Sequence, residues 1–459
     1  MHAVFVALCA PASADPRASC EAEVAQLGSG SGGCAALVDV YNRDPAHCGD
    51  EVVYQAGVCF AHERSLGTAI LMFNMLEKYF PSSPRARQAL GLLGTTYAGV
   101  AFFDRASDAL EAYAKKFAGE RDAPDALANA IRYREALGDP ARAAADVAQY
   151  ARTFRDPRAA ADAAFSLAQM YERRGEPVAF ARELRAYLAA FGASGGDDHA
   201  IVAHAELGLQ LWAQACPVAL LDGACMKLVP PPPPSRGATR SVCGPAAKPR
   251  LVAVPRDPAK ANAAMAELGA ATRAYEQAFA RSDEARHAYA LAKLAIADLE
   301  FERFLAIAFP HQIARFQTYF NAKTKASTVA AEKLEQILAI KDADGAIAAA
   351  ARLGQLAQAY VDDLYAAEIP ADVRTGDHAD DQINAYCDAL ATAGQPLATR
   401  AIDAYTICLA KADELQSFGP WSQLCERELA VLAPEQFPPA AELRGVADAA
   451  RPVTAFEVP

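Results

Sequence analysis

The feature that most constrains this chain is an aromatic pair that returns at a fixed interval. The motif Tyr-x-x-x-Phe begins at Tyr113, Tyr150 and Tyr187, so that consecutive copies start 37 residues apart (150 − 113 = 187 − 150 = 37). Phe80 precedes Phe117, the phenylalanine of the first copy, by the same interval. A period of this size is typical of a repeated supersecondary element that buries its apolar face only when copies stack. The sequence therefore predicts a repeat array.

The residues between the aromatic pairs indicate that each repeat is a helical hairpin. Turn signals lie at 136–140 ("ALGDP") and 173–177 ("RRGEP"). Tyr and Phe four residues apart share one helix face, so we expect them to pack between repeats and not to form an exposed ladder for a ligand. Small and aromatic positions recur with the same period: Ala69, Ala106 and Ala143; Gly57, Gly94, Ile131 and Ala168; Phe60, Tyr97, Arg134 and Tyr171.

This order of residues resembles the tetratricopeptide repeat (TPR). The second repeat carries it most fully, as Gly94-x-x-Tyr97, Phe103-x-x-Ala106 and then Tyr113. The resemblance covers about 50–215, with four repeats and a fainter fifth that starts at residue 197. It implies an all-α solenoid of helical hairpins, preceded by an N-terminal helical cap at 15–49.

The rest of the chain predicts more helices after an interruption. Five consecutive prolines, Pro230 to Pro234, exclude a helix and favour polyproline II, so we expect 216–256 to be a Cys/Pro-rich linker. A degenerate TPR-like helical array is expected over 257–459, and long alternating Val, Ile and Thr runs that would predict sheet are missing. Helices are expected at 258–278, 282–308, 311–340, 344–366, 379–393, 395–417 and 420–432.

The first residues predict export. An apolar run from Ala3 to Ala10 precedes Ala12-Ser13-Ala14, a small-x-small pattern that signal peptidase accepts. We expect a signal peptide at 1–14 with cleavage after Ala14; the alternative is a buried N-terminal helix. No later segment has about 20 consecutive apolar residues, so no transmembrane segment is expected in the mature chain.

Cysteine usage agrees with export. Of eleven cysteines, removal of Cys9 with the leader leaves ten, an even number that suits disulfides in an oxidising compartment. The alternative is a set of buried free thiols. The sequence does not fix the connectivity, but neighbouring cysteines give plausible pairs: Cys20–Cys34, Cys48–Cys59, one pair among Cys216, Cys225 and Cys243, and Cys408–Cys425.

No motif indicates catalysis, a cofactor or a metal. The glycine-rich stretch at 28–33 joins two helical segments, not a strand and a helix, so we expect a loop. His47-Cys48 with Cys59-x-x-His62 offers a zinc alternative to a disulfide.

The overall charge and the other polar residues do not indicate nucleic-acid binding or a further metal or catalytic site. The net charge of −12, without a basic stripe, argues against nucleic acid. His199 and His204 do not have the spacing that shares a helix face, and the acidic pairs at 197–198 and 362–363 are expected to be solvated. No small-molecule substrate is expected.

The TPR resemblance implies a binding groove on the first helix of each repeat, where a protein partner would lie. Tyr54 and Val58 stand where chaperone-binding TPR proteins need Lys and Asn, which disfavours that class of partner. The groove positions carried over are Tyr54, Val58 and His62, then Gln88, Thr95 and Ala98, then Asp125, Arg132 and Glu135, then Asp162, Gln169, Glu172 and Arg173.

Several stretches also resemble exported TPR proteins of deltaproteobacteria, a family that includes components of the myxobacterial gliding-motility machinery. They are 53–70, 122–139, 323–340, 346–370 and 396–415. The resemblance implies a periplasmic adaptor between envelope proteins. The alternatives are a scaffold for envelope biogenesis or secretion, and an enzyme with a cryptic site in the C-terminal half. A convergent cluster of His, Asp and Glu in a deep pocket would favour the enzyme.

Overall fold

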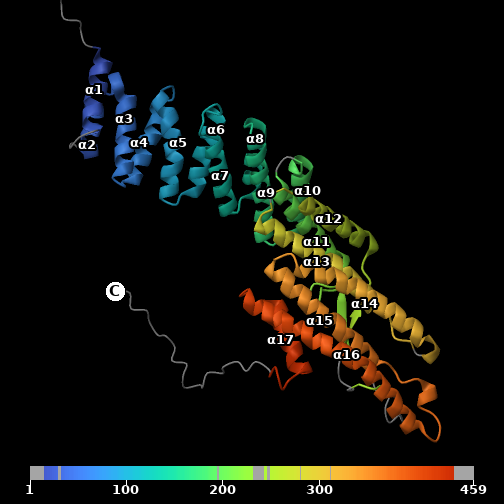
Figure 1. Cartoon of the computed structure of the whole chain (residues 1–459). Coiled ribbons are helices and arrows are strands. Elements are labelled where there is room, and N and C mark those ends of the chain that lie inside the picture. Colours follow the sequence, from blue (N-terminus) through green and yellow to red (C-terminus); the bar gives the residue numbers. More distant parts are fainter. Residues whose placement is uncertain are drawn as a thin grey trace, which may run out of the picture. The chain divides into compact units, whose positions relative to one another are not determined.

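The computed structural model confirms the predicted all-α solenoid. It describes residues 15–28, 33–193, 196–230, 242–244, 249–279, 281–310 and 312–438. These residues form seventeen α-helices and one two-stranded sheet, coloured along the sequence in Figure 1. The chain divides into two compact units, the first ending at residue 195 and the second starting at residue 196.

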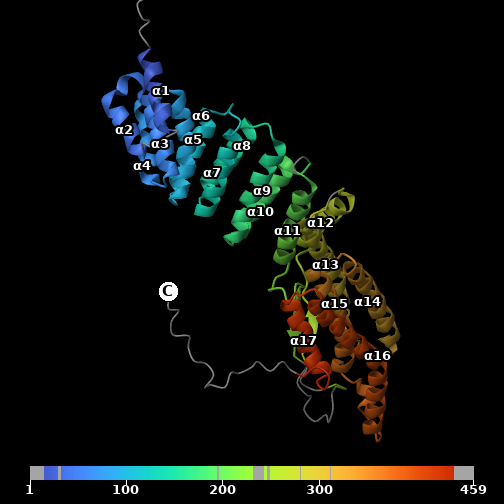
Figure 2. The ribbon, with the colours of Figure 1, turned by 60° about the vertical axis from the view of Figure 1, so that its left-hand side comes forward.

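The first unit is a TPR-like stack of helical hairpins. Each helix packs against the next along the chain, and α3 also contacts α5 as α7 contacts α9. Figure 2 shows the hairpins α3–α4, α5–α6, α7–α8 and α9–α10 side by side in chain order. The helices are α1 (Pro16–Gly28), α2 (Gly33–Arg43), α3 (Pro45–His62), α4 (Leu66–Tyr79), α5 (Pro84–Gly99), α6 (Phe103–Lys116), α7 (Ala123–Leu137), α8 (Pro140–Thr153), α9 (Pro157–Arg173) and α10 (Pro177–Phe191).

The turn inside every one of these four hairpins has the same backbone conformation. Arg64, Ala101, Gly138 and Gly175, each 37 residues after the last, have φ of 63°, 61°, 72° and 68°. Glycine adopts this left-handed region without a steric penalty, whereas the Cβ of arginine or alanine is strained there. The period therefore fixes the backbone of the turn as well as the packing of the helices.

The aromatic pairs are packed between helices as the sequence predicts. Tyr113, Tyr150 and Tyr187 are 6%, 4% and 1% exposed, and Phe154 is buried with them. The ring centroids of Tyr150 and Phe154 lie 5.0 Å apart. The hydroxyl of Tyr113 donates to Oδ1 of Asp122 at 2.7 Å, just before the next repeat begins. The tyrosine thus joins one hairpin to the following one.

Small residues let the two helices of a hairpin approach closely. A Cβ at Gly57 would lie 2.5 Å from the Phe73 ring, and one at Gly94 would lie 2.5 Å from Leu110. Phe73 and Leu110 are themselves 37 residues apart, so the large side chain and the small one that receives it repeat together. Ala106 on α6 is fully buried at another position of the period.

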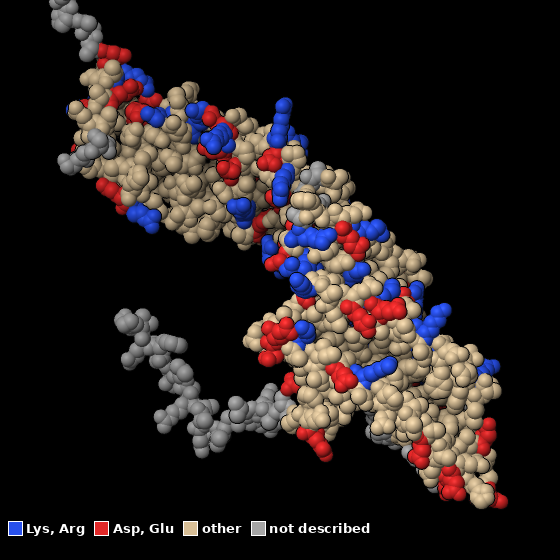
Figure 3. All heavy atoms as spheres, in the orientation of Figure 1, with Lys and Arg blue, Asp and Glu red and all other residues tan. Residues whose placement is uncertain are grey.

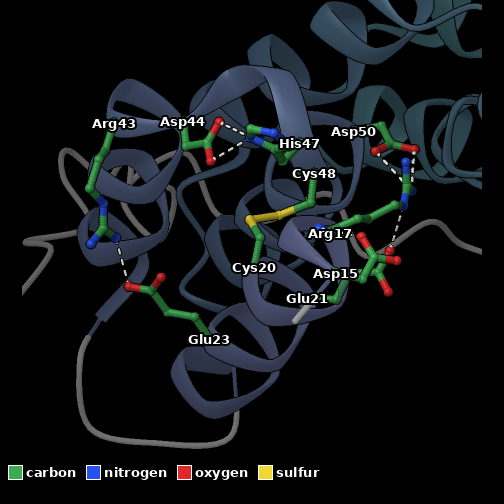
Figure 4. The surroundings of a disulfide bond; sticks show 10 residues. All are labelled: Asp15, Arg17, Cys20, Glu21, Glu23, Arg43, Asp44, His47, Cys48 and Asp50. Atoms are coloured by element: carbon green, nitrogen blue, oxygen red, sulfur yellow. Dashed lines mark hydrogen bonds and ion pairs between the residues drawn. A yellow bond between two sulfur atoms is a disulfide. The ribbon is translucent and has the colours of Figure 1, made fainter. Parts of the chain in front are cut away.

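Two disulfides attach the first two helices to α3, and they correct the predicted pairing. Cys20 of α1 bonds Cys48, and Cys34 of α2 bonds Cys59, with Cα atoms 6.0 and 5.5 Å apart. The predicted pairs Cys20–Cys34 and Cys48–Cys59 are wrong, because α3 contacts both α1 and α2 and its two cysteines meet different helices. Figure 4 shows the bond between Cys20 and Cys48 beside the ion pair of Arg17 with Asp50.

The second unit is helical apart from one short hairpin of strands. The helix α11, which the repeat period assigns to a fainter fifth repeat, packs against α12 and α13. The elements are α11 (Asp197–Ala215), β1 (Met226–Val229), β2 (Arg250–Ala253), α12 (Pro258–Gln277), α13 (Asp283–Leu305), the 3-10 turn η1 (Ile313–Arg315), α14 (Phe316–Leu338), α15 (Ala343–Ala366), the 3-10 turn η2 (Ala371–Val373), α16 (Ala379–Glu414) and α17 (Pro420–Leu432).

The helix α16 continues where the sequence predicts a break. Helices are expected at 379–393 and 395–417, but a single helix contains Pro396 in its interior. Pro396 is exposed, so water can satisfy the carbonyl that loses its intrahelical donor. Gly394 is buried and faces Tyr365 of α15. Packing on α15 therefore outweighs the local preference to end the helix.

The described parts of 216–256 do more than connect two helical regions. β1 and β2 pair antiparallel. Cys216 bonds Cys225, which confirms one pair within the predicted group of three, and the predicted pair Cys408–Cys425 is confirmed too. Cys243 bonds Cys387, 144 positions away, which no predicted pair includes. Residues 231–241, with most of the proline run, lie outside the described residues, as does the predicted signal peptide at 1–14.

A buried ionic centre fastens this segment to the helices. We define it as the three ion pairs Arg256–Glu302 at 2.7 Å, Arg352–Asp298 at 2.7 Å and Lys323–Asp363 at 2.6 Å, in which every side chain is at most 7% exposed.

Two members of the ionic centre hold the backbone of the segment directly. Glu302 accepts from the N–H of Cys225 at 2.6 Å, and Arg352 donates to the carbonyl of Asp222. Burial raises the pKa of Asp298 to about 6, against the opposing charge of Arg352. The segment is thus part of the core of the second unit.

Candidate partner-binding surface

All the groove residues carried over from the TPR resemblance lie on the first helices of the hairpins, α3, α5, α7 and α9. Three of the eleven principal residues are half-buried: Tyr54, Glu135 and Gln169. The other eight are exposed: His62, Gln88, Thr95, Asp125, Arg132, Asp162, Glu172 and Arg173. We call this set the first-helix face.

Arg85, which the sequence analysis does not single out, joins the first two repeats on this face. Its guanidinium lies 4.8 Å from the ring centroid of Tyr54 and donates to Oε1 of Gln88 at 2.7 Å. It also donates to Oε1 of Glu51 at 2.9 Å. The repeat period gives no signal for this pair, because Glu51 and Arg85 are 34 residues apart, not 37.

Glu135 and two arginines come together between α7 and α9. The hydroxyl of Ser166 donates to Oε2 of Glu135 at 2.7 Å. Burial raises the pKa of Glu135, while the Ser166 hydrogen bond and the charges of Arg173 and Arg132 oppose the shift. Neither arginine lies within 4.0 Å of a carboxylate in the described part of the chain. Their exposed guanidinium groups are therefore available to a carboxylate of a partner.

The charges of Asp125 and Asp162 act on Tyr150 of the second helix α8. Burial raises the pKa of Tyr150, and the carboxylates of Asp156, Asp125 and Asp162 add to the shift. These carboxylates are thus close to the aromatic pair at the junction between repeats. Thr95 is satisfied within its own helix, since its hydroxyl donates to the carbonyl of residue 92 at 2.9 Å.

An ionic cluster that the sequence analysis misses lies on α6, α7 and α8. Arg134 occupies an aromatic position of the repeat period, is fully buried, and pairs with three carboxylates of α6. An arginine at an aromatic position is the one sequence signal for it. Burial and the neighbouring charge of Glu111 raise the pKa of Asp146 to about 7. The members of this α6–α8 cluster are Asp104, Asp108, Glu111, Arg134, Arg142 and Asp146.

The second unit has two adjoining cavities of about 280 and 290 Å³ beside α15 and α17. Gln358, Asp362 and Val431 line both. Gln358 donates to Glu428 at 2.8 Å and accepts from the hydroxyl of Tyr405 at 2.6 Å. Carboxylates line these cavities, but no histidine does among the described residues. The convergent cluster that would favour an enzyme is not assembled in them.

Both cysteines of the zinc alternative are used in disulfides. Cys48 bonds Cys20, and Nδ1 of His47 lies 2.8 Å from Asp44. Cys59 lies near Glu63, but its sulfur is bonded to Cys34. Of the second histidine pair, His204 lies 2.7 Å from Glu267. Each of these groups therefore has a partner within the protein.

Two further features concern the distribution of charge on the surface and the apolar character of the helices. On the face seen in Figure 3, acidic and basic side chains are intermingled along the helices of each unit. Among the described residues, no helix combines the length and the apolar character that a membrane span requires.

Comparisons with known proteins give structural matches only. No family model and no curated protein sequence matches the chain. Among solved structures, the complex "Structure of Naa15/Naa10 bound to HypK-THB" matches with a TM-score of 0.27 and 12% identity over 92% of this chain. Yeast Tom70 matches with a TM-score of 0.22 and 10% identity over 84% of this chain. The matches cover 66% and 88% of those chains, so this protein spans about two thirds of the first. Neither match bears on its partners.

Proposed function

We propose that this protein is an exported scaffold that holds protein partners together in a cell-envelope complex. Stacked helical hairpins present a long, continuous surface suited to binding another protein segment. The resemblance of several stretches to exported TPR proteins of deltaproteobacteria supports an adaptor role of the kind found in gliding-motility machinery. A scaffold for envelope biogenesis or secretion is the alternative within the same class.

The pair Arg132 and Arg173 carries the binding part of the proposal. Both are exposed, neither has a carboxylate partner in the described part of the chain, and the half-buried Glu135 lies near both. Unpaired guanidinium groups on a repeat surface recognise carboxylates with charge-assisted, bidentate geometry. The partner segment is therefore expected to carry Asp or Glu where it crosses α7 and α9.

The cysteines support the exported part of the proposal. Every cysteine among the described residues is in a disulfide, and the five bonds are spread over both units. Disulfides persist in oxidising compartments and are rare where glutathione and thioredoxin keep thiols reduced. A structure held by five such bonds suits the periplasm.

The test is capture of cell-envelope proteins by the oxidised full chain after chemical cross-linking. The double variant Arg132→Gln with Arg173→Gln is expected to lose most of the captured partner, because two carboxylate-binding groups are removed. The matched control is Arg152→Gln with Arg185→Gln, two exposed arginines on the second helices α8 and α10.

Circular dichroism shows whether both variants remain folded. Equal capture by the test and control variants would place the binding surface away from α7 and α9. The identity of the captured proteins separates the motility role from the biogenesis or secretion role.

A further inference from the structure

A third cavity, about 550 Å³ in volume, lies between α14, α15 and α16 of the second unit. We call it the α14–α16 cleft. None of its lining residues belongs to the first-helix face or to the two cavities beside α17. α15 packs against both α14 and α16, and its Tyr360 and Leu364 line the cleft between them.

The lining residues form stripes along helix faces. Those of α14 run from Phe320 to Glu335 and those of α16 from Ala393 to Arg400, and in both helices they recur with each helical turn. Fifteen steps of an α-helix span about 22 Å. The α14 wall is therefore long enough to contact an elongated segment, about four turns of a helix.

The chemistry of the cleft is amphipathic. Phe320, Ala331 and Leu397 give it a partly exposed apolar lining over the buried Tyr360 and Leu364. Glu332 and Glu335 lie at one end of the α14 stripe and are exposed. Neither glutamate forms an ion pair within the described residues, although Lys333 between them pairs with Glu300 at 3.3 Å. Two unpaired carboxylates beside an apolar lining are complementary to a basic side chain on an apolar segment.

The wall that α16 forms contains Pro396. It lines the cleft within the continuous helix α16. Proline has no N–H, so one carbonyl of the preceding turn has no donor within the helix. The exposed Arg400, one turn further on, also has no ion pair among the residues that the structure describes.

From this arrangement we infer that the α14–α16 cleft binds an amphipathic helix of a partner protein. Its apolar face lies on Phe320, Ala331 and Leu397, and a Lys or Arg at one end pairs with Glu332 and Glu335. Binding of an amphipathic helix in an apolar groove is a recurrent mode of protein recognition. The inference rests on the proposed scaffold function and adds a second docking surface, in the second unit.

The experiment uses the oxidised full chain and a displayed library of 18-residue peptides. The library has apolar residues at helical spacing and randomised polar positions. We expect the enriched peptides to carry Lys or Arg at one end. Ala331→Trp, which fills the cleft, is expected to weaken their binding at least tenfold. The double variant Glu332→Lys with Glu335→Lys is expected to do the same.

The controls separate this cleft from other surfaces. Glu77→Lys with Glu426→Lys reverses two exposed glutamates elsewhere and should leave binding unchanged. Arg132→Gln with Arg173→Gln should also leave it unchanged, so failure of the first-helix face and failure of the cleft are distinguishable. Because the charge variants alter only exposed residues, they test the cleft even if Ala331→Trp disturbs the fold.

Three results of the peptide selection would overturn the inference. The first is no enrichment, and the second is enrichment of peptides without a basic residue. The third is unchanged binding by both cleft variants. Sedimentation of the full chain tests a second copy as the occupant: self-association that Ala331→Trp abolishes would assign the cleft to that copy and contradict a partner helix.

Discussion

The two units are both helical, but different kinds of contact stabilise each of them internally. In the first unit each hairpin packs on its neighbours in the sequence, and the same turn and the same aromatic pair recur every 37 residues. In the second unit the core contains the ionic centre and the Cys243–Cys387 bond, whose members come from distant parts of the chain. Local repetition is visible in a sequence, whereas a single long-range contact is not.

The two units also differ in how the charge of a buried cation is neutralised. Arg134 in the first unit is fully buried, but two of its partners, Asp104 and Asp108, have side chains 69% and 49% exposed. Arg352 in the second unit is equally buried, and the side chain of its partner Asp298 is only 3% exposed. The first cation is neutralised at the surface and the second inside the core.

The largest expected effect concerns the disulfide that closes the longest loop. Removing Cys243–Cys387 with Cys243→Ala and Cys387→Ala should destabilise the second unit by roughly 5 kcal/mol, since the bond restricts 144 residues of the unfolded chain. Removing Cys34–Cys59, which spans 25 residues, should cost the first unit roughly 3 to 4 kcal/mol. Hydrogen exchange of peptides from α16 and α3 in urea measures each unit separately. Equal losses in the two units would contradict the contrast.

The next effect concerns the buried cations. Arg352→Met leaves Asp298 buried without its partner and should cost about 3–5 kcal/mol. Arg134→Met should cost about 1–2 kcal/mol, because water can solvate Asp104 and Asp108 when the arginine is removed. Unfolding curves of the two variants, followed by peptides from α15 and α7, test this order. A larger loss for Arg134→Met would show that the α6–α8 cluster is the more tightly coupled of the two.

The smallest expected effect concerns the repeated turn. Ala101 has φ of 61° at a position where two other repeats have glycine. Ala101→Gly should stabilise the first unit by up to about 1 kcal/mol, because relief of the left-handed strain exceeds the entropy that glycine adds to the unfolded chain. The control is Ala98→Gly on the preceding helix, which should destabilise it by about 1 kcal/mol. A loss of stability with Ala101→Gly would mean that the turn does not strain the alanine.

The sequence predicts the fold of the first unit more completely than that of the second. The 37-residue period predicts the four hairpins, the burial of Tyr150 and Phe154 and the close crossing at Gly94, because each contact lies within one repeat or between neighbours. The period carries no information on the strands β1 and β2 or on Arg352 with Asp298. These features depend on residues far apart in the sequence. Each occurs only once in the described residues, so no repeated sequence pattern indicates it.

The binding surface is predicted less completely. The resemblance to TPR proteins places the groove residues on α3, α5, α7 and α9, and the structure adds that Arg132 and Arg173 lie near Glu135. Arg85 is missed because its contacts with Tyr54 and Gln88 do not follow the period. The α14–α16 cleft is missed because three separate helices must meet before its lining exists.

The crossed bonds at the N-terminus have a consequence for how the protein matures. Cys20 bonds Cys48 and Cys34 bonds Cys59, so each bond encloses one cysteine of the other. On the proposed export route Cys20 and Cys34 would emerge before Cys48 and Cys59, and an oxidase acting in order of emergence would join them. The mixed product must then be rearranged by thiol–disulfide exchange before α3 can pack. We therefore expect production of the native protein to depend on a disulfide isomerase, and a host that only oxidises thiols to accumulate misbonded chains.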